Sequence, residues 1–246
     1  MLKNSRKKEK KAFPKNKIAS SIGTRKESSL HRSLKFRYSG SGGATETLIG
    51  GYVCDVKTSK GEIIEVQTGS FGPLKEKVKN LAQSTDVRIV HPIINQKRIE
   101  LYDTSGQLLR SRKSPRKGCL WDLFSALIHA AELPLLENLV IELAVIDVIE
   151  KRVDDGTGSW RRRGARIDDR LLGAWHESVI LNKPKDYCRF IPFARGKSFT
   201  VKDLSLAAGI NAALARKTLY VLSKINLVEK TGKQGNAFIY KKRAGH

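Results

Sequence analysis

The chain has 246 residues, with 47 Lys and Arg against 24 Asp and Glu, which gives a formal net charge of +23. Such an excess opposes compaction and is best explained by a polyanionic partner, nucleic acid first of all. The basic residues are spread along the whole chain, and the longest apolar stretch, 139–149, is too short to cross a bilayer. These features argue against a membrane protein.

Three separated cysteines have no metal-ligand spacing and indicate a reducing compartment, and the basic N-terminus lacks the apolar segment of a secretory signal. A cytoplasmic location is therefore expected. The composition predicts four parts: a disordered basic arm or solubilising tail over 1–19, an α/β domain over 20–118, a connecting α/β region over 119–190, and a small C-terminal domain over 191–246. Homodimerisation is left open.

The first expected helix begins at Thr24, where Thr24 and Glu27 match a capping box, and it runs to Tyr38. Steps of four residues place Glu27, His31 and Lys35 on one face of this helix. Two β-rich runs follow, over 46–55 and 62–69, joined by a turn at 59–61. This part therefore predicts a helix followed by a hairpin.

Further along, a helix is expected over 73–83, a strand over 87–94, and a hairpin from 97–102 and 107–110. Helix, strand, strand, helix, strand is the order of a mixed sheet with helices packed against it. The later segments predict an amphipathic helix over 120–133 and strands over 139–153 and 172–181.

The hairpin carries the residues with the clearest chemistry. Asp55 lies near the end of its first run, and Glu65 and Gln67 lie two apart on its second run, on one predicted face. Paired carboxylates on neighbouring strands can hold a hard divalent cation beside a phosphodiester. Structural roles are the alternatives for all three acids: Glu27 could serve as a cap, Asp55 could open the turn, and Glu65 could have a purely structural role in its strand.

Glu27, Asp55, Glu65 and Gln67 occur in an order that resembles the PD-(D/E)XK, or restriction-endonuclease-like, nuclease superfamily. There a helix glutamate precedes a hairpin that supplies an aspartate and then Glu-x-Lys, followed by a helix and a strand. The resemblance covers about residues 24–95. It implies that Asp55 and Glu65 hold Mg²⁺ (or Mn²⁺), with the carbonyl of Val66, and that Glu27 contacts the metal through water.

One residue departs from that pattern. Gln67 replaces the family lysine, and glutamine can hydrogen-bond a water or phosphate but has no charge and cannot act as a base. Either an active enzyme or a binding-only domain is compatible with this change. Lys35, Lys75 and Lys77, all on predicted helices, are candidates for supplying the missing charge and for contacting DNA.

A loop between the two later strands combines an aromatic residue with three arginines, Trp160, Arg161, Arg162 and Arg163. Stacking plus positive charge would suit a nucleic-acid backbone or an unpaired base. An exposed, solvated loop is the alternative.

The last part reads as helix, turn, helix and hairpin, and it resembles the winged-helix family. The resemblance implies that a helix beginning near Asn211 presents Arg216 and Lys217 to the major groove of DNA. Lys233 and Gln234 would then lie in the wing, against phosphate. Winged helices also bind proteins, so DNA contact is the favoured reading of two.

The sequence thus predicts a Mg²⁺-dependent DNA endonuclease. A catalytically inactive DNA-binding or regulatory protein on the same fold is the alternative, and an RNA-binding protein is a third reading. The histidines lack zinc-hydrolase spacing, and no phosphate-binding glycine loop or dinucleotide fingerprint occurs, so these chemistries are not expected.

Overall fold

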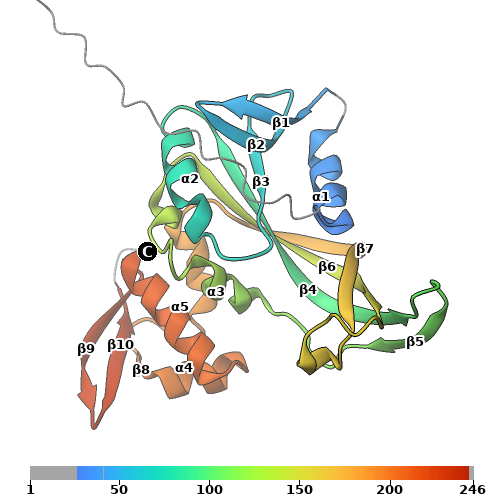
Figure 1. Cartoon of the computed structure of the whole chain (residues 1–246). Helices are drawn as coiled ribbons and strands as arrows, with labels where there is room; N and C mark the ends of the chain where they lie inside the picture. The colour runs from blue at the N-terminus through green and yellow to red at the C-terminus, as the bar shows by residue number, and fades with distance from the viewer. Residues whose placement is uncertain (1–26, 41, 244–246) are drawn as a thin grey trace, which may run out of the picture.

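The structure, a computed structural model, describes residues 27–40 and 42–243. It contains a seven-stranded mixed sheet in the order β1-β2-β3-β4-β6-β7, with β5 paired to β4, and a three-stranded sheet in the order β8-β10-β9 (Figure 1). The helices are α1 (Ser29–Ser39), α2 (Lys75–Leu81), α3 (Leu123–Leu127), α4 (Val201–Ala208) and α5 (Ala212–Lys224). The strands are β1 (Ala44–Ile49), β2 (Tyr52–Lys57), β3 (Ile63–Val66), β4 (Val87–Tyr102), β5 (Leu108–Lys113), β6 (Leu139–Val153), β7 (Arg166–Leu181), β8 (Ser198–Phe199), β9 (Val228–Gln234) and β10 (Ala237–Lys242).

The start of the first helix differs from the prediction. Ser28 is the N-cap of α1, and its side chain accepts a hydrogen bond from the His31 amide, so Glu27 precedes the helix. Ser, unlike Glu, has a short hydroxyl side chain that reaches the amides of the first turn. Thr24, the expected cap, and the basic arm over 1–19 lie outside the described residues.

The first β-rich run is itself a hairpin. β1 and β2 are antiparallel, with Ile49 opposite Tyr52, and Gly50 and Gly51 form the two-residue turn between them at φ +56° and +84°. Two successive positive φ angles are what a tight hairpin turn requires and what glycine tolerates best. The predicted hairpin around 59–61 is also present, since β2 pairs antiparallel with β3.

The main sheet is mixed because β3, β4 and β6 run parallel, whereas β1, β2 and β7 run antiparallel to their neighbours. The central strands carry dense β-branched residues, as expected of strands buried on both faces. One apolar cluster packs α1 on one face through Leu30 and Leu34. A larger cluster covers the other face with α2 and α3 and continues into α4 and α5.

Residues on both sides of the expected boundary at 118 belong to this one sheet. β4 is a single strand where two segments were expected, and it pairs with β6 along almost its whole length, while β7 pairs with β6 in turn. The far ends of these strands project beyond the helices, together with β5 (Figure 1). We call this projection, formed by residues 97–113 and 148–172, the arm.

The helix expected over 120–133 is shorter. A 3₁₀ turn leads into α3, which ends at Leu127. The carbonyl of Ala126, which would accept the Ala130 amide in a continuing helix, accepts instead from the amide of Phe71 at 2.9 Å. The Ala130 amide turns to Leu127, so a contact from a distant segment ends the helix.

The helix, turn, helix and hairpin expected at the C-terminus are present, and the short strand β8 was not expected. Thr200 caps α4 in a capping box with Asp203, Gly209 ends the helix at φ +63°, and α5 and the β9–β10 hairpin follow. The wider description of the main unit, a mixed sheet flanked by helices, also agrees with the structure. In the described part of the chain, no helix is long and apolar enough to span a membrane.

Candidate active site

Asp55 and Glu65 come together where β2 and β3 separate. The regular pairing of these strands includes Val56 opposite Ile64. One step further, the Asp55 carboxylate accepts the amide of Val66 at 2.9 Å, and the Asp55 amide points at Oε1 of Glu65 at 3.4 Å. A side chain thus replaces a backbone bond of the ladder, and the two acids become direct neighbours.

The two carboxyls differ in their environment. Glu65 is only 3 % exposed, and burial, together with the nearby charge of Asp55, raises its pKa even though Lys77 opposes the shift. Burial also acts on Asp55, but bonds from His31 and the Val66 amide and the charge of Lys35 outweigh it, so the pKa of Asp55 is lowered. Asp55 is therefore ionised at lower pH than Glu65.

Side chains before and on α1 surround Asp55. Nζ of Lys35 lies 2.9 Å from Glu27, 3.1 Å from Glu46 and 3.7 Å from Asp55, and its side chain is 8 % exposed. Burial lowers the pKa of Lys35, yet these acids reverse the effect and raise it. Nε2 of His31 lies 3.2 Å from Oδ2 of Asp55 and 3.7 Å from Glu27.

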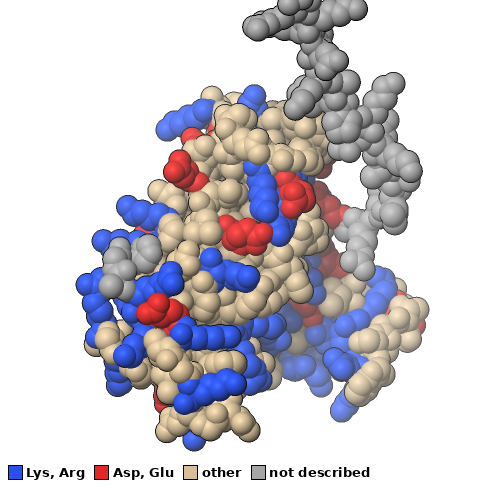
Figure 2. Space-filling model, turned by 90° about the vertical axis from the view of Figure 1, so that its left-hand side faces the viewer, with Lys and Arg blue, Asp and Glu red and all other residues tan. Residues whose placement is uncertain are grey.

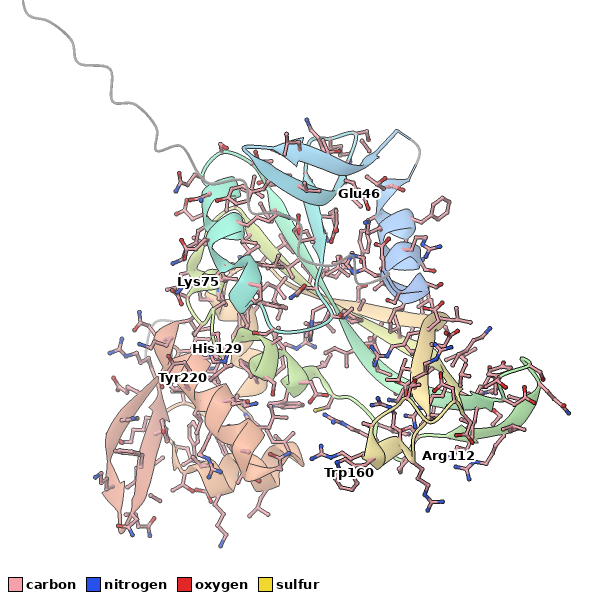
Figure 3. All side chains as sticks on the ribbon, viewed as in Figure 1. Glu46, Lys75, Arg112, His129, Trp160 and Tyr220 are labelled. Carbon is pink, nitrogen blue, oxygen red and sulfur yellow. The ribbon has the colours of Figure 1, made fainter. Side chains whose placement is uncertain are left out.

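The predicted grouping of Glu27 with Asp55 is thus present, although it is mediated by Lys35 and His31 and Glu27 is not helical. Glu46 is a member of this cluster that sequence reasoning missed. It lies on β1, a strand that the prediction did not separate from β2 (Figure 3). Its backbone φ of +53° is unusual for a residue other than glycine.

The lysine that reaches Glu65 is Lys77. Its Nζ lies 2.5 Å from Oε1 of Glu65 and 2.6 Å from the carbonyl of Val53, which fixes α2 against β2 and β3. Lys75 lies two residues before Lys77, and its Nζ pairs instead with Glu132 at 2.6 Å, outside the site. Of the three candidate lysines, Lys35 and Lys77 contact the acids and Lys75 does not.

Gln67 lies beyond the end of β3 and turns away from the acids. Its side-chain nitrogen Nε2 donates to the carbonyl of Ser70 at 2.5 Å, and its main-chain carbonyl accepts from Nδ1 of the buried His91 at 2.6 Å. Over residues 27–40 and 42–243, no hydrogen bond joins Gln67 to Asp55 or Glu65. Glu65 and Gln67 were expected to act together on one face of the sheet, but Gln67 bonds Ser70 and His91 instead of the acids.

The site offers few ligands for a hard divalent cation. Within the described ranges, no group of three or more His, Cys, Asp and Glu side chains is arranged to hold a metal. Two carboxylates remain, Asp55 and Glu65, and Mg²⁺ is commonly bound through one or two carboxylates, with water and substrate phosphate completing its shell. The predicted ligands thus suit this ion, with Lys77 now occupying one of the Glu65 oxygens.

A cavity of about 460 Å³ lies past the carboxyl end of β3, and neither Asp55 nor Glu65 lines it. The Gly69–Ser70 turn forms one wall, and His91, Lys97 and Arg116 contribute polar groups. In sheets with parallel strands, ligands commonly bind at such carboxyl ends.

The predicted DNA contacts of the C-terminal unit fall into two classes. Asn211 is the N-cap of α5 and accepts the Leu214 amide, and Nζ of Lys217 donates to Ser125 of α3 at 3.2 Å, so both are used within the fold. Arg216 is exposed, as are Lys233 and Gln234 in the β9–β10 hairpin.

Basic residues are spread widely over the side of the molecule that carries this unit (Figure 2). The later part of α5 faces the main unit, where Tyr220 lines an open cavity with Lys75 and His129 (Figure 3). The outer surface of α5 is therefore free mainly at its N-terminal half.

The model of a family described as "Domain of unknown function (DUF8091)" matches residues 28–182, from α1 to the end of β7. An uncharacterized protein of Treponema pallidum (strain Nichols) is 28 % identical over 222 residues, which is 90 % of this chain and 87 % of that protein. No solved structure gives a significant match.

Proposed function

The chain belongs to the DUF8091 family, and we propose that it is a metal-dependent DNA nuclease whose cation is held by Asp55 and Glu65. The observation that carries the proposal is the meeting of these acids at the point where β2 and β3 separate, with Lys77 on one of them. The element order α1, β1, β2, β3, α2, β4 supports the resemblance to PD-(D/E)XK nucleases, because the acids lie on two adjacent strands of that order.

The positions of the lysines support an active enzyme despite Gln67. Lys77 places an ammonium group beside the metal-ligand acid, where the family pattern has a lysine two residues after the glutamate. A positive charge fixed there would stabilise the negative charge that develops on a phosphodiester during attack. The charge is thus supplied from α2 instead of β3.

The remaining side chains would position this machinery. Mg²⁺, bound to Asp55, Glu65 and the Val66 carbonyl, would supply Lewis-acid activation of a water and of the scissile phosphate. Lys35 and His31 keep Asp55 ionised and hold its carboxylate between β2 and α1. Glu27 would hold Lys35 in place through their ion pair next to the start of α1.

The C-terminal unit would position the duplex. Its order of helix, turn, helix and hairpin supports the winged-helix resemblance, and Arg216, Lys233 and Gln234 are exposed for phosphate contact. Since Lys217 is bound to Ser125, contact by α5 would depend on its N-terminal half.

A catalytically inactive DNA-binding protein is the second candidate. The observation that favours it is the Lys77–Glu65 ion pair, which already neutralises the buried acid and competes with a cation.

Cleavage of DNA separates the two candidates. Purified protein would be incubated with Mg²⁺ or Mn²⁺ and with linear, branched or single-stranded DNA, beside Asp55→Ala and Glu65→Ala. Glu132→Ala is a matched control, because Glu132 also pairs with a lysine of α2 but lies outside the site. Loss of cleavage in Asp55→Ala and in Glu65→Ala, with DNA binding retained, supports the nuclease. Absence of metal-dependent cleavage on every substrate would refute it.

A further inference from the structure

The arm carries a cavity with five arginines among its nine lining residues. Its volume is about 220 Å³, and its polar walls are Arg110, Arg112, Arg152, Arg162 and Arg163, with Asp154 as the one acid. Pockets for drug-sized ligands are usually larger, roughly 300–1,000 Å³. The space therefore suits a small anionic group better than a whole cofactor.

The arginines come from three separate segments. Arg110 and Arg112 lie on β5 opposite Leu101 and Ile99, and paired residues of antiparallel strands share one face of the sheet. Arg152 lies near the end of β6, and Arg162 and Arg163 lie in the loop before β7. Only the pairing of the long strands brings these segments together.

Acidic groups do not balance this charge. Arg152 donates to the buried Glu150 at 2.5 Å, but Lys97 and Arg170 each lie 3.2 Å from the same carboxylate. These cations hold the pKa of Glu150 down, to about 2, against the effect of burial. One acid is thus shared among three basic side chains behind the cavity wall.

Four of the five guanidinium groups, those of Arg110, Arg112, Arg162 and Arg163, make no ion pair with any residue in 27–40 or 42–243. Like charges gathered in this way repel one another unless a counter-anion joins them. A guanidinium presents a planar fork of donors that matches two oxygens of a phosphate group. The positive charge and the donor geometry of the cavity thus suit a phosphate group.

The loop beside the cavity is held in a fixed shape. The amide of Gly158 donates to the Gly164 carbonyl at 2.6 Å, and Nε of Arg162 donates to the Ala165 carbonyl at 3.0 Å. A Cβ atom at Gly158 would lie 2.0 Å from the Ala165 oxygen, so only glycine fits. Arg163 itself has φ +53°, a strained conformation for a residue with a side chain.

The same loop presents an aromatic ring. Trp160 is 82 % exposed, and the guanidinium carbon of Arg161 lies 5.5 Å from its ring centroid. Trp160 and Arg112 lie on the same lobe of the molecule, at the end of the arm (Figure 3). An exposed indole in the loop that contributes Arg162 and Arg163 to the cavity offers a stacking surface to a base that is not paired.

We infer that the arm is a binding site for single-stranded DNA, in which the arginine cavity takes a backbone phosphate and Trp160 stacks on a neighbouring unpaired base. This site goes beyond the proposed catalytic centre, since it uses none of the acids and needs no metal. It predicts that the preferred substrate has a single-stranded segment, such as a flap, gap or branch.

The test measures binding of the full chain in EDTA, so that cleavage does not enter. Fluorescence anisotropy would follow a labelled single-stranded DNA, the same sequence as duplex, and the same sequence as RNA, at several salt concentrations. The variants are Arg110→Ser with Arg112→Ser, and Trp160→Ala. The control is Arg98→Ser with Lys113→Ser, which removes two charges from the opposite face of the same strand pair.

The cavity variant should weaken single-strand binding about tenfold or more, and its slope of log affinity against log salt should become shallower by about 0.7, the contribution of one phosphate contact to a single strand. Trp160→Ala should weaken single-strand binding at least about fivefold and leave duplex binding unchanged. The control should bind like wild type, and thermal unfolding should show all variants folded.

Equal weakening by the cavity and control pairs would overturn the site in favour of diffuse charge attraction. Tighter binding of the RNA, with the same dependence on Trp160, would overturn its assignment to DNA. The outcome is separable from the nuclease proposal, because loss of cleavage in Asp55→Ala leaves this binding intact if both proposals hold.

Discussion

Lys77 is the residue on which the proposed site depends most directly. In Lys77→Met, Glu65 at 3 % exposure loses the ammonium group 2.5 Å away, and the Val53 carbonyl loses its donor. Removing one partner of a buried ion pair costs about 3–5 kcal/mol. For a chain of this size that corresponds to a fall in unfolding temperature of roughly 6–20 °C.

The assay is thermal unfolding in EDTA and again with Mg²⁺. Lys77→Met should unfold early in EDTA, and Mg²⁺ should raise its unfolding temperature more than that of wild type, because the cation no longer competes with the lysine. Lys75→Met is the control, since Lys75 pairs with Glu132 at the surface, and it should unfold near wild type.

Adding Glu65→Gln to Lys77→Met should recover at least half of the lost stability, because a neutral amide needs no buried counter-charge. The reasoning fails if Lys77→Met is as stable as Lys75→Met in EDTA. It also fails if Mg²⁺ stabilises the Lys77 variant no more than it stabilises the wild type.

Three further outcomes are expected. Gln67→Ala should keep metal-dependent cleavage within about tenfold of wild type, because its amide bonds the Ser70 carbonyl and not the acids; a loss like that of Asp55→Ala would contradict this. Mn²⁺ affinity should fall as the pH drops through the raised pKa of Glu65, where a proton competes with the metal, and this dependence should vanish in Glu65→Gln when affinity is titrated by calorimetry. The lowered pKa of Glu150 stabilises the fold above pH 4.5 and is lost as the pH falls toward 2, so Glu150→Gln should cost about 2–3 kcal/mol in urea unfolding at pH 7 and much less near pH 2.

Local patterns in the sequence accounted for much of the fold. The helix, turn and helix at the C-terminus were expected from local signals, and the dense β-branched residues of 139–153 indicated β6. These features act between residues close in the chain, so they can be read without a tertiary structure. Asp55 and Glu65 belong to the same class, because a short hairpin connects their strands.

The predictions that failed depended on distant contacts or on competing caps. The helix after Leu120 stops because Phe71 takes the carbonyl of Ala126, and nothing in the local sequence indicates this bond. Ser28 displaced Thr24 as the cap of α1, since two suitable hydroxyl residues stand close together in the sequence. The turn at Gly50 and Gly51 was readable, as paired glycines favour a two-residue hairpin.

The sequence by itself determined that Asp55 and Glu65 lie on neighbouring strands, that a glutamine stands two residues after Glu65, and that positive charge is in excess. Only the tertiary structure decided which lysine pairs with Glu65 and which arginines line one cavity. Lys77 reaches Glu65 because α2 packs on the face of β3 that carries this acid. Arg112 and Arg163 line one cavity because β5 and β6 both pair with β4. Residue type sets the charge of a side chain, but the energy of its interaction with another charge depends on their distance, and packing fixes that distance.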